Sequence, residues 1–429
     1  MTPPVPNVQL DADGAVFPGD GTVGKETAHV HDPTIVRLKG RYFCFSTSGN
    51  GFGVMRSSDD LQSWTVHGAV IPETPEWIRK RYSHRSLWAP DIVQFGDTVR
   101  MYYCASNFGT NLSVMGFLEN KAFDPAEPQK GWVDQGMILE STPGVSEYNA
   151  IDPEVVIDER GRHWMFFGSY WGGIYLFELD PKTGKRLHPD RAPVCVAKNT
   201  GDRGNPLEAP AVLQHDGYYY LFVSYGLAAQ GVRSTYRIMV GRSKDIEGPY
   251  VDADGKSMVE GGHVNVLKGS PPMFAPGHND VFRDAEGRPL LAYHFYDGRH
   301  HWNGDNWGRP NLQIRELLWT KDGWPLPGLP IETGRRSDAK GGAGFVGEWI
   351  HQADFGQPRP LTVKPDGTME QGERRGTWKL ENGEAVLEWT IEGRTFRDVL
   401  KLAYGDSYYV GRNQAGSIIR GIRPGLGAK

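Results

Sequence analysis

One short pattern recurs five times along the chain, and it restricts the fold more than any other feature. The first copy, HDPTIVRLKGRYFCFSTS, begins at His31 and predicts two paired strands: an Asp-Pro start, a β-branched apolar run, a turn at Lys39-Gly40 and an aromatic run. Four more copies follow, and the anchor residues of all five are Pro33, Pro90, Pro153, Pro210 and Asn279. The steps between these anchors are 57, 63, 57 and 69 residues. This spacing predicts a repeat fold built from strands.

The length of the repeat indicates which repeat fold to expect. Each period leaves room for about four strands, which make one blade of a β-propeller. The sequence therefore predicts an all-β chain with a five-bladed β-propeller over residues 29–335. Residues 1–28 are rich in Pro, Gly and Asp and are predicted to form an extended lead-in.

A second unit follows a break in composition. Residues 332–347, ETGRRSDAKGGAGFVG, are charged and then Gly-rich, as linkers are. Beyond them, short strand patterns alternate with Asp-Gly, Asn-Gly and Gly-Asp turns. We expect a separate small β-barrel over residues 345–429.

Charge excludes some classes of partner. The 429 residues carry a net charge of −5, so no basic field favours nucleic acid or an anionic membrane. The sequence has no apolar stretch long enough to span a bilayer, and its first residues do not resemble a signal peptide. The protein is therefore expected to be cytosolic or to have lost a leader.

The propeller geometry directs attention to the start of each repeat. The first strand of every blade lines the central channel, so residues at the five repeat starts should converge. These residues are Asp32, Trp88, Asp91, Asp152, Glu208, His278 and Asp280. A single Asp before Pro is an ordinary turn opener, whereas several carboxylates in register favour a site, because clustered acids repel one another and lose hydration.

Carboxylates facing each other across a cleft with aromatic walls are suited to glycoside hydrolysis. One protonated acid delivers a proton to the leaving oxygen, and one ionised base activates water. Trp88, Phe108 and Trp171 are candidate platforms for sugar rings, although each could equally pack in a blade.

Several runs together resemble glycoside hydrolase family 43, the five-bladed propellers that cleave arabinose- and xylose-containing polysaccharides. These runs are HDPTI, LWAPDI, NAIDPEV, LEAP and GHND. Within that family, SNFGTNLSVMG, GSYWGGI, GVRSTYRIMVGRS and GPYVDADGKSMVEGG are similar to endo-1,5-α-L-arabinanases. The small C-terminal barrel is similar to one carried by longer bacterial arabinanases.

The resemblance implies roles for individual residues. It implies Asp32 as general base, Glu208 as general acid, and Asp152 as a carboxylate that holds the acid and raises its pKa. Members of the family hydrolyse the bond with inversion of configuration at the anomeric carbon. His278 is implied to ligate a calcium ion whose other ligands are mostly waters. The residues implied to line the sugar subsites are Trp88, Asp91, Asn107, Phe108, Asn149, Ser169, Trp171, Ser234 and Thr235.

Alternatives remain open at this point. An exo-acting α-L-arabinofuranosidase or β-xylosidase of the same family would have a pocket closed at one end. A non-catalytic sugar-binding propeller would be expected to lack one of the three carboxylates. We expect arabinan as the partner of a monomer that is secreted or periplasmic, its leader absent from this sequence, with a cytoplasmic protein as the alternative.

Overall fold

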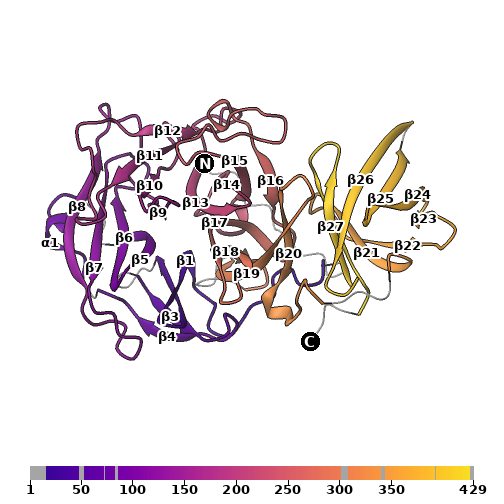
Figure 1. The fold of residues 1–429 in the computed structure, drawn as a ribbon, viewed down its shortest axis with the longest axis horizontal. Helices are drawn as coiled ribbons and strands as arrows, with labels where there is room; N and C mark the ends of the chain where they lie inside the picture. The colour runs from indigo at the N-terminus through magenta and orange to yellow at the C-terminus, as the bar shows by residue number, and fades with distance from the viewer. Residues whose placement is uncertain are drawn as a thin grey trace, which may run out of the picture.

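The five repeats form five four-stranded antiparallel sheets arranged around a central channel, and a separate barrel lies beside them (Figure 1). The computed structural model describes residues 16–47, 53–71, 73–82, 86–300, 308–339, 344–391 and 393–425. The predicted fold class, a five-bladed β-propeller followed by a small β-barrel, is confirmed.

Each blade follows the chain order from the channel outwards. Blades 1 and 2 consist of β1 (His31–Leu38), β2 (Arg41–Thr47), β3 (Met55–Ser58), β4 (Thr65–Gly68), β5 (Trp88–Phe95), β6 (Thr98–Ser106), β7 (Ser113–Asn120) and β8 (Val133–Ser141). Blades 3 and 4 consist of β9 (Glu154–Ile157), β10 (His163–Phe167), β11 (Ile174–Leu179), β12 (Val194–Ala197), β13 (Leu207–His215), β14 (Tyr218–Tyr225), β15 (Arg237–Ser243) and β16 (Val264–Leu267). Blade 5 consists of β17 (Met273–Arg283), β18 (Pro289–Asp297), β19 (Arg309–Trp319) and β20 (Pro325–Pro330).

Helix is scarce in the described residues. The short helical segments are α1 (Glu76–Arg79), η1 (Gly231–Arg233), η2 (Met258–Glu260) and η3 (Ile331–Thr333). Within the described ranges, no helix has the length and apolar character needed to cross a membrane.

The first strands close the ring around the channel. β1 contacts β5 and β17, β5 contacts β9, and β13 contacts β9 and β17. Apolar clusters fill the spaces between neighbouring blades, and the cluster between blades 5 and 1 joins β1 and β2 to β18 and β19. Among the described residues no strand is shared between the first and last blades, which are joined by apolar packing and by hydrogen bonds such as that from the Ile35 N–H to Asp280.

Every first strand is distorted at the same place. Asp32, Ala89, Asp152, Ala209 and His278 occupy the position before the Pro or Asn anchor, and all have left-handed φ values, between +41° and +56°. The strand register shifts beside the residue in β1, β5, β13 and β17. A bulge of this kind re-aims a side chain, and a non-glycine residue in this conformation costs about 1–2 kcal/mol. The channel-facing starts of the repeats are therefore built at some cost in strain.

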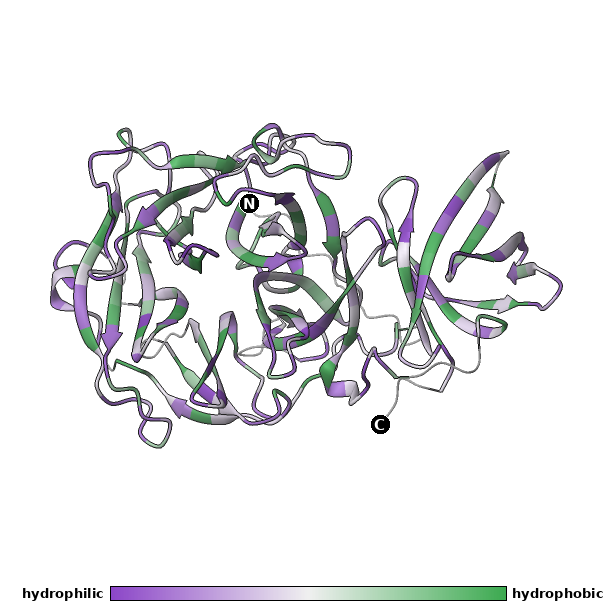
Figure 2. Ribbon diagram, viewed as in Figure 1, coloured by the Kyte–Doolittle hydropathy of each residue, from purple (hydrophilic) through white to green (hydrophobic). Residues whose placement is uncertain are grey.

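The C-terminal barrel is a closed ring of eight antiparallel strands. They are β21 (Gly347–Ala353), β22 (Arg359–Val363), β23 (Thr368–Gln371), β24 (Arg374–Glu381), β25 (Glu384–Ile391), β26 (Arg394–Ala403), β27 (Tyr408–Asn413) and β28 (Ile418–Ile422). β21 pairs with β28 and closes the ring. Figure 2 shows hydrophobic and hydrophilic segments alternating along several of these strands, as expected when one face points inwards.

The barrel packs against blade 5 and against the segment that precedes β1. One apolar cluster combines Phe17, Leu326 and Leu329 with barrel residues Tyr404 and Tyr408. At the edge of this apolar cluster, the buried carboxylate of Asp20 bonds to Arg315 of the propeller and Arg420 of the barrel. Phe17 and Asp20 of the lead-in are thus packed between propeller and barrel, whereas Lys25 and Ala28 bridge to Ser63 and Asn311 of the propeller.

Candidate active site

A cleft of about 450 Å³ opens over the channel, and all five blades contribute to its wall. Its wall includes Asp32, Trp88, Asp152, Glu208 and His278, one from each blade. The repeat starts therefore do converge, as the channel geometry predicts.

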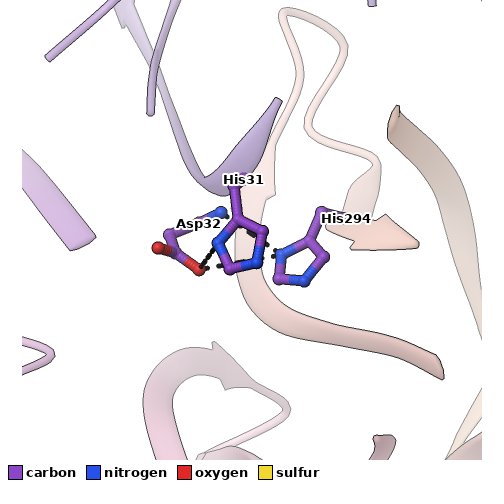
Figure 3. Close-up of side chains that lie close together, drawn as sticks. All are labelled: His31, Asp32 and His294. Atoms are coloured by element: carbon purple, nitrogen blue, oxygen red, sulfur yellow. Dashed lines mark hydrogen bonds and ion pairs between the residues drawn. The ribbon is translucent and has the colours of Figure 1, made fainter. Parts of the chain in front are cut away.

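Asp32 lies at the centre of a hydrogen-bonded group of histidines (Figure 3). Its Oδ1 is 2.7 Å from Nδ1 of His31 and 3.0 Å from Nδ1 of His278. Its Oδ2 accepts a hydrogen bond of 2.7 Å from the Thr47 hydroxyl, and its backbone N–H donates to Nδ1 of His294 at 3.2 Å. The carboxylate is thereby fixed in position from several sides.

These neighbours keep Asp32 ionised. Burial would raise the pKa of Asp32, but the positive charges of His278 and His31 outweigh burial and hold it well below its usual value. Burial would likewise lower the pKa of His278, but Asp32, Asp152 and Glu208 raise it to about 9. A carboxylate that stays ionised at neutral pH is suited to act as a base.

The pKa of Glu208 is displaced in the opposite direction, upwards. Burial raises the pKa of its carboxyl group, and hydrogen bonds from Ser169 and Tyr236 reduce that rise without cancelling it. The Ser169 hydroxyl donates to Oε2 at 2.5 Å, and the Tyr236 hydroxyl donates to Oε1. Asp32 and Glu208 thus have pKa values displaced in opposite directions, which is how one site holds a base and an acid.

Asp152 lies next to Glu208 along the channel. Its Oδ2 accepts a hydrogen bond of 3.3 Å from the backbone N–H of Ala209, the residue after Glu208. Burial, together with the charges of Glu208 and Asp32, raises the pKa of Asp152 to about 8. Because the pKa values of both Asp152 and Glu208 are raised, the two carboxyl groups share at least part of one proton at neutral pH.

Three aromatic side chains line the cleft at its rim. Phe108 is 73% exposed and Trp171 is 40% exposed, and Trp88 packs edge-on against Phe108 with ring centroids 6.5 Å apart. Trp171 has a φ of +38°, and Nδ2 of Asn205 donates to its carbonyl at 2.8 Å. An exposed aromatic held on a strained, hydrogen-bonded turn favours a binding role over packing.

Four residues predicted to contact sugar, Asp91, Asn107, Ser234 and Thr235, are not among the residues that line the cleft, so their contact with sugar stays a prediction. Asp91 is 6% exposed, and its carboxylate accepts the Val155 N–H at 2.8 Å below the cleft. Ser234 and Thr235 accept backbone N–H groups of their own loop, from Gln230 and Leu227. Asn107 anchors a turn through its carbonyl, which accepts the Thr110 hydroxyl. These residues hold loops and blades in place, whereas Asn149 and Ser169 do line the cleft.

Three further residues of the site were missed by sequence reasoning: His31 and Tyr236 in the cleft wall, and the fully buried His294 behind it. Tyr236 directly follows the predicted Ser234-Thr235 pair, and His31 directly precedes Asp32. His294 lies in β18, the second strand of blade 5, and the repeat alignment predicts channel positions only for first strands. His31 could have been found from the sequence, because it belongs to the same motif as Asp32. His294 could not, because only the folded chain brings it next to Asp32.

One group of three possible metal ligands occurs among the described residues, and it consists of His31, Asp32 and His294. The lone pair of Nδ1 on His294 already accepts the N–H of Asp32, and Nδ1 of His31 is bonded to the Asp32 carboxylate. The two imidazole rings stack with centroids 3.9 Å apart. We interpret this group as hydrogen-bonded support for Asp32.

Two carboxyls with oppositely displaced pKa values, in an aromatic-lined cleft over the channel of a five-bladed propeller, are suited to the chemistry of a glycoside hydrolase. The sequence profile of glycosyl hydrolases family 43 matches residues 27–325. The chain belongs to this family.

Known relatives are similar over the propeller or over nearly the whole chain. An extracellular exo-α-(1→5)-L-arabinofuranosidase from Cellvibrio japonicus is 36% identical, with 70% of this chain and 87% of the relative covered. An extracellular endo-α-(1→5)-L-arabinanase from Bacillus subtilis is also 36% identical, with 70% and 88% covered. Among solved structures, an endo-1,5-α-L-arabinanase from Thermotoga petrophila has a TM-score of 0.75 at 26% identity, covering 94% of this chain and 100% of that one.

Proposed function

We propose that this enzyme hydrolyses internal α-1,5-arabinofuranosyl linkages of arabinan with inversion at the anomeric carbon. The names of its relatives support the substrate, and one solved relative, a Cellvibrio cellulosa α-L-arabinanase with 34% identity and a TM-score of 0.64, is complexed with arabinohexaose. The observation that carries the proposal is the pair Asp32 and Glu208, whose pKa values are displaced in opposite directions within one cleft.

In the proposed reaction Glu208 is the acid and Asp32 is the base. Glu208 donates its proton to the glycosidic oxygen while Asp32 accepts a proton from a water that attacks the anomeric carbon from the opposite face. Asp152 shares a proton with Glu208, because a charge on either carboxyl raises the pKa of the other, and it fixes the backbone beside Glu208. Inversion requires the carboxyls of Asp32 and Glu208 to lie roughly 6.5–9.5 Å apart, which leaves room for the water.

The apolar faces of arabinose rings would bind along the cleft to Trp88, Phe108 and Trp171. Sugar hydroxyl groups would contact Asn149 and Ser169, which are part of the cleft wall. The extracellular relatives support a secreted enzyme. We also propose that the protein is a monomer.

A calcium ion at His278 belongs to the same proposal, and the residues fit it. Nδ1 of His278 faces Asp32, and no described residue hydrogen-bonds to its Nε2. Metal binding would require the His278 ring to lose one proton; Nδ1–H would still bond to the Asp32 carboxylate and Nε2 would be left for the metal, and because calcium prefers oxygen, waters would supply most ligands. When bound, the ion would supply positive charge that favours ionised carboxylates nearby. We expect a chelator to lower the melting temperature and the activity, and added calcium to restore both; unchanged values would remove the ion from the proposal.

The second candidate is exo action, because the Cellvibrio japonicus relative is named an exo-acting enzyme and is as similar as the endo-acting Bacillus relative. Product sizes from debranched arabinan decide between them. Early products of many lengths support endo action, and one short product from the outset supports exo action. A β-xylosidase would release xylose from xylo-oligosaccharides and leave arabinan intact.

The mechanism is tested with Glu208→Ala on debranched arabinan. We expect activity to fall by at least about 100-fold, because general acid catalysis contributes factors of about 10²–10⁴. The anomer released first by the wild-type enzyme, followed by proton NMR, should be inverted relative to the substrate. Full activity in the variant, or retention of configuration, would contradict the assignments.

A further inference from the structure

The lumen of the C-terminal barrel is apolar at one end and polar at the other. Inward-facing residues at one end form an apolar core that includes Trp349, Leu361, Met369 and Leu387. At the other end a cavity of about 330 Å³ remains. The barrel mouth, as we name this cavity, is lined by His351, Gln371, Arg374, Trp389, Phe396 and Asp398. The open end of a β-barrel is a frequent place for small ligands, and this volume is at the lower end of the usual range.

Two buried polar side chains in the barrel mouth are short of partners. Gln371 is 9% exposed, and no described residue hydrogen-bonds to its amide. Asp398 is 3% exposed, and among the described residues its carboxylate accepts only one hydrogen bond, from Nε1 of Trp389 at 3.1 Å. A carboxylate can accept about four, and an amide can both donate and accept. These groups face the cavity, and a ligand that brings hydroxyl groups would supply the missing partners.

The barrel mouth carries charges of both signs, from Asp398 on one side and from Arg359 and Arg374 on the other. Burial raises the pKa of Asp398 to about 6, which leaves it mainly ionised at neutral pH. Burial and the nearby charge of Arg374 lower the pKa of His351 to about 4, so its ring is neutral. Asp398 would repel an anion and the two guanidinium groups would repel a cation, while each attracts the opposite charge, so neither sign is favoured throughout the cavity. A neutral ligand with both donors and acceptors satisfies the two together.

The aromatic residues complete this chemistry. Phe396 is half-buried, and Trp389 lies at the floor beside Asp398. Aromatic faces bind the C–H face of a sugar ring, while carboxylate, amide and guanidinium groups bind its hydroxyls. We propose that the barrel mouth is a second carbohydrate site, separate from the propeller cleft, that binds one ring of a neutral oligosaccharide. The choice of arabinose as that sugar rests on the proposed function.

The test titrates linear arabinotriose into the full chain carrying Glu208→Ala, which should slow hydrolysis by at least about 100-fold, and uses calorimetry to count sites. Adding Arg374→Ala should remove one site. Arg374 is exposed, and its side chain makes no hydrogen bond with a described residue, so the barrel should still fold. Arg397→Ala is the matched control, since Arg397 is exposed on the same barrel, one residue before Asp398, and pairs with Glu381. The control should keep every site.

Hydrogen exchange gives a second readout. Arabinotriose should protect β23, β24 and β26, and Arg374→Ala should abolish that protection while any protection of the propeller cleft persists. Equal site numbers in the Arg374→Ala and Arg397→Ala proteins, or no protection in the barrel, would overturn the second site. An acidic oligogalacturonide that binds the mouth better than arabinotriose would overturn its neutral specificity. Failure of the wild-type enzyme to cleave arabinan would contradict the proposed function instead, because site counting does not depend on catalysis.

Discussion

Glu208 is held by two hydroxyl groups that act on its pKa. Ser169 and Tyr236 donate to its two carboxyl oxygens, and each bond favours the ionised form. Burial acts in the opposite direction and dominates. The pH at which the proposed acid loses its proton therefore depends on how many of these bonds are made.

Removal of one hydroxyl should move the alkaline limb of the activity profile. In Tyr236→Phe, Glu208 loses a donor that stabilises its ionised form, so its pKa rises. Because a hydrogen bond to a charged group is worth about 1.5–3 kcal/mol, we expect the alkaline limb of kcat/KM to move upwards by about one pH unit. The profile of kcat/KM against pH on a soluble arabino-oligosaccharide measures this shift.

A matched tyrosine in the same blade controls for packing effects. Tyr225 is also buried, and its hydroxyl donates to the Lys198 carbonyl at 3.2 Å, away from Glu208. Tyr225→Phe should leave the profile in place. A shift of equal size in both variants, or a downward shift in Tyr236→Phe, would show that Tyr236 does not tune the acid.

The residues that sequence could identify are those carried by the repeat. Asp32, Asp152, Glu208 and His278 lie at or next to one repeat position, so alignment of the five copies predicts that they converge. Tyr236 precedes β15, in a loop that the repeat start does not include. A side chain contributed by such a segment has no register to predict it, and only the folded chain shows its contact with Glu208.

At the scale of the strands, three of the five repeats carry an acidic side chain two residues beyond the distorted position. Asp91 accepts the N–H of Val155, Glu154 accepts that of Val212 at 2.9 Å, and Asp280 accepts that of Ile35 at 2.5 Å. Each bond joins one blade to the next. The sequence places Asp91 in register with Glu154 and Asp280, not with Asp32, and this register was the available signal that Asp91 joins blades.

Asp91 should therefore affect stability and not substrate binding. Burial raises its pKa to about 6, so folding favours the protonated form, and stability falls as pH rises from about 4 to 6. Above pH 6 the cost is on the order of 3 kcal/mol. Asp91→Asn removes the charge but keeps an oxygen for Val155, so it should be at least as stable as wild type at pH 8 and less stable relative to it at pH 4.

Denaturant unfolding at the two pH values and KM for arabinan check this prediction. Asp91→Ala serves as the comparison, because it leaves the Val155 N–H unpaired and should cost about 1–3 kcal/mol. If Asp91→Asn instead raised KM with no change in stability, Asp91 would return to the set of sugar-binding residues.

At the scale of the whole molecule, the repeat predicts the propeller and the turn-rich tail predicts the barrel, but neither predicts how they join. The junction is formed by Asp20, which is 4% exposed. Nη2 of Arg315 in β19 lies 2.6 Å from its Oδ1, and the guanidinium of Arg420 in β28 bonds to both its carboxyl oxygens. Asp20 lies in a segment without regular periodicity, and its two partners are 295 and 400 residues away, so no local pattern links them.

Loss of Asp20 should weaken the propeller and the barrel together. Asp20→Ala would leave two buried guanidinium groups without their carboxylate, and breaking a buried pair in this way costs about 3–5 kcal/mol. Burial would raise the pKa of Asp20, but Arg420 and Arg315 outweigh it and lower that pKa. Its contribution is therefore present above about pH 4 and is lost as pH falls through the lowered pKa.

Urea unfolding at pH 7, followed through the intrinsic fluorescence of the whole chain, measures the loss. Asp338→Ala is the matched control, because Asp338 also pairs with an arginine, Arg336, but both side chains are exposed. Exposed pairs contribute about 0–1 kcal/mol, so the control should unfold nearly as wild type does. Equal effects of the two substitutions would contradict a structural role for the Asp20 junction. A large effect of Asp20→Ala alone would mean that the segment before β1 is needed to hold the barrel against blade 5.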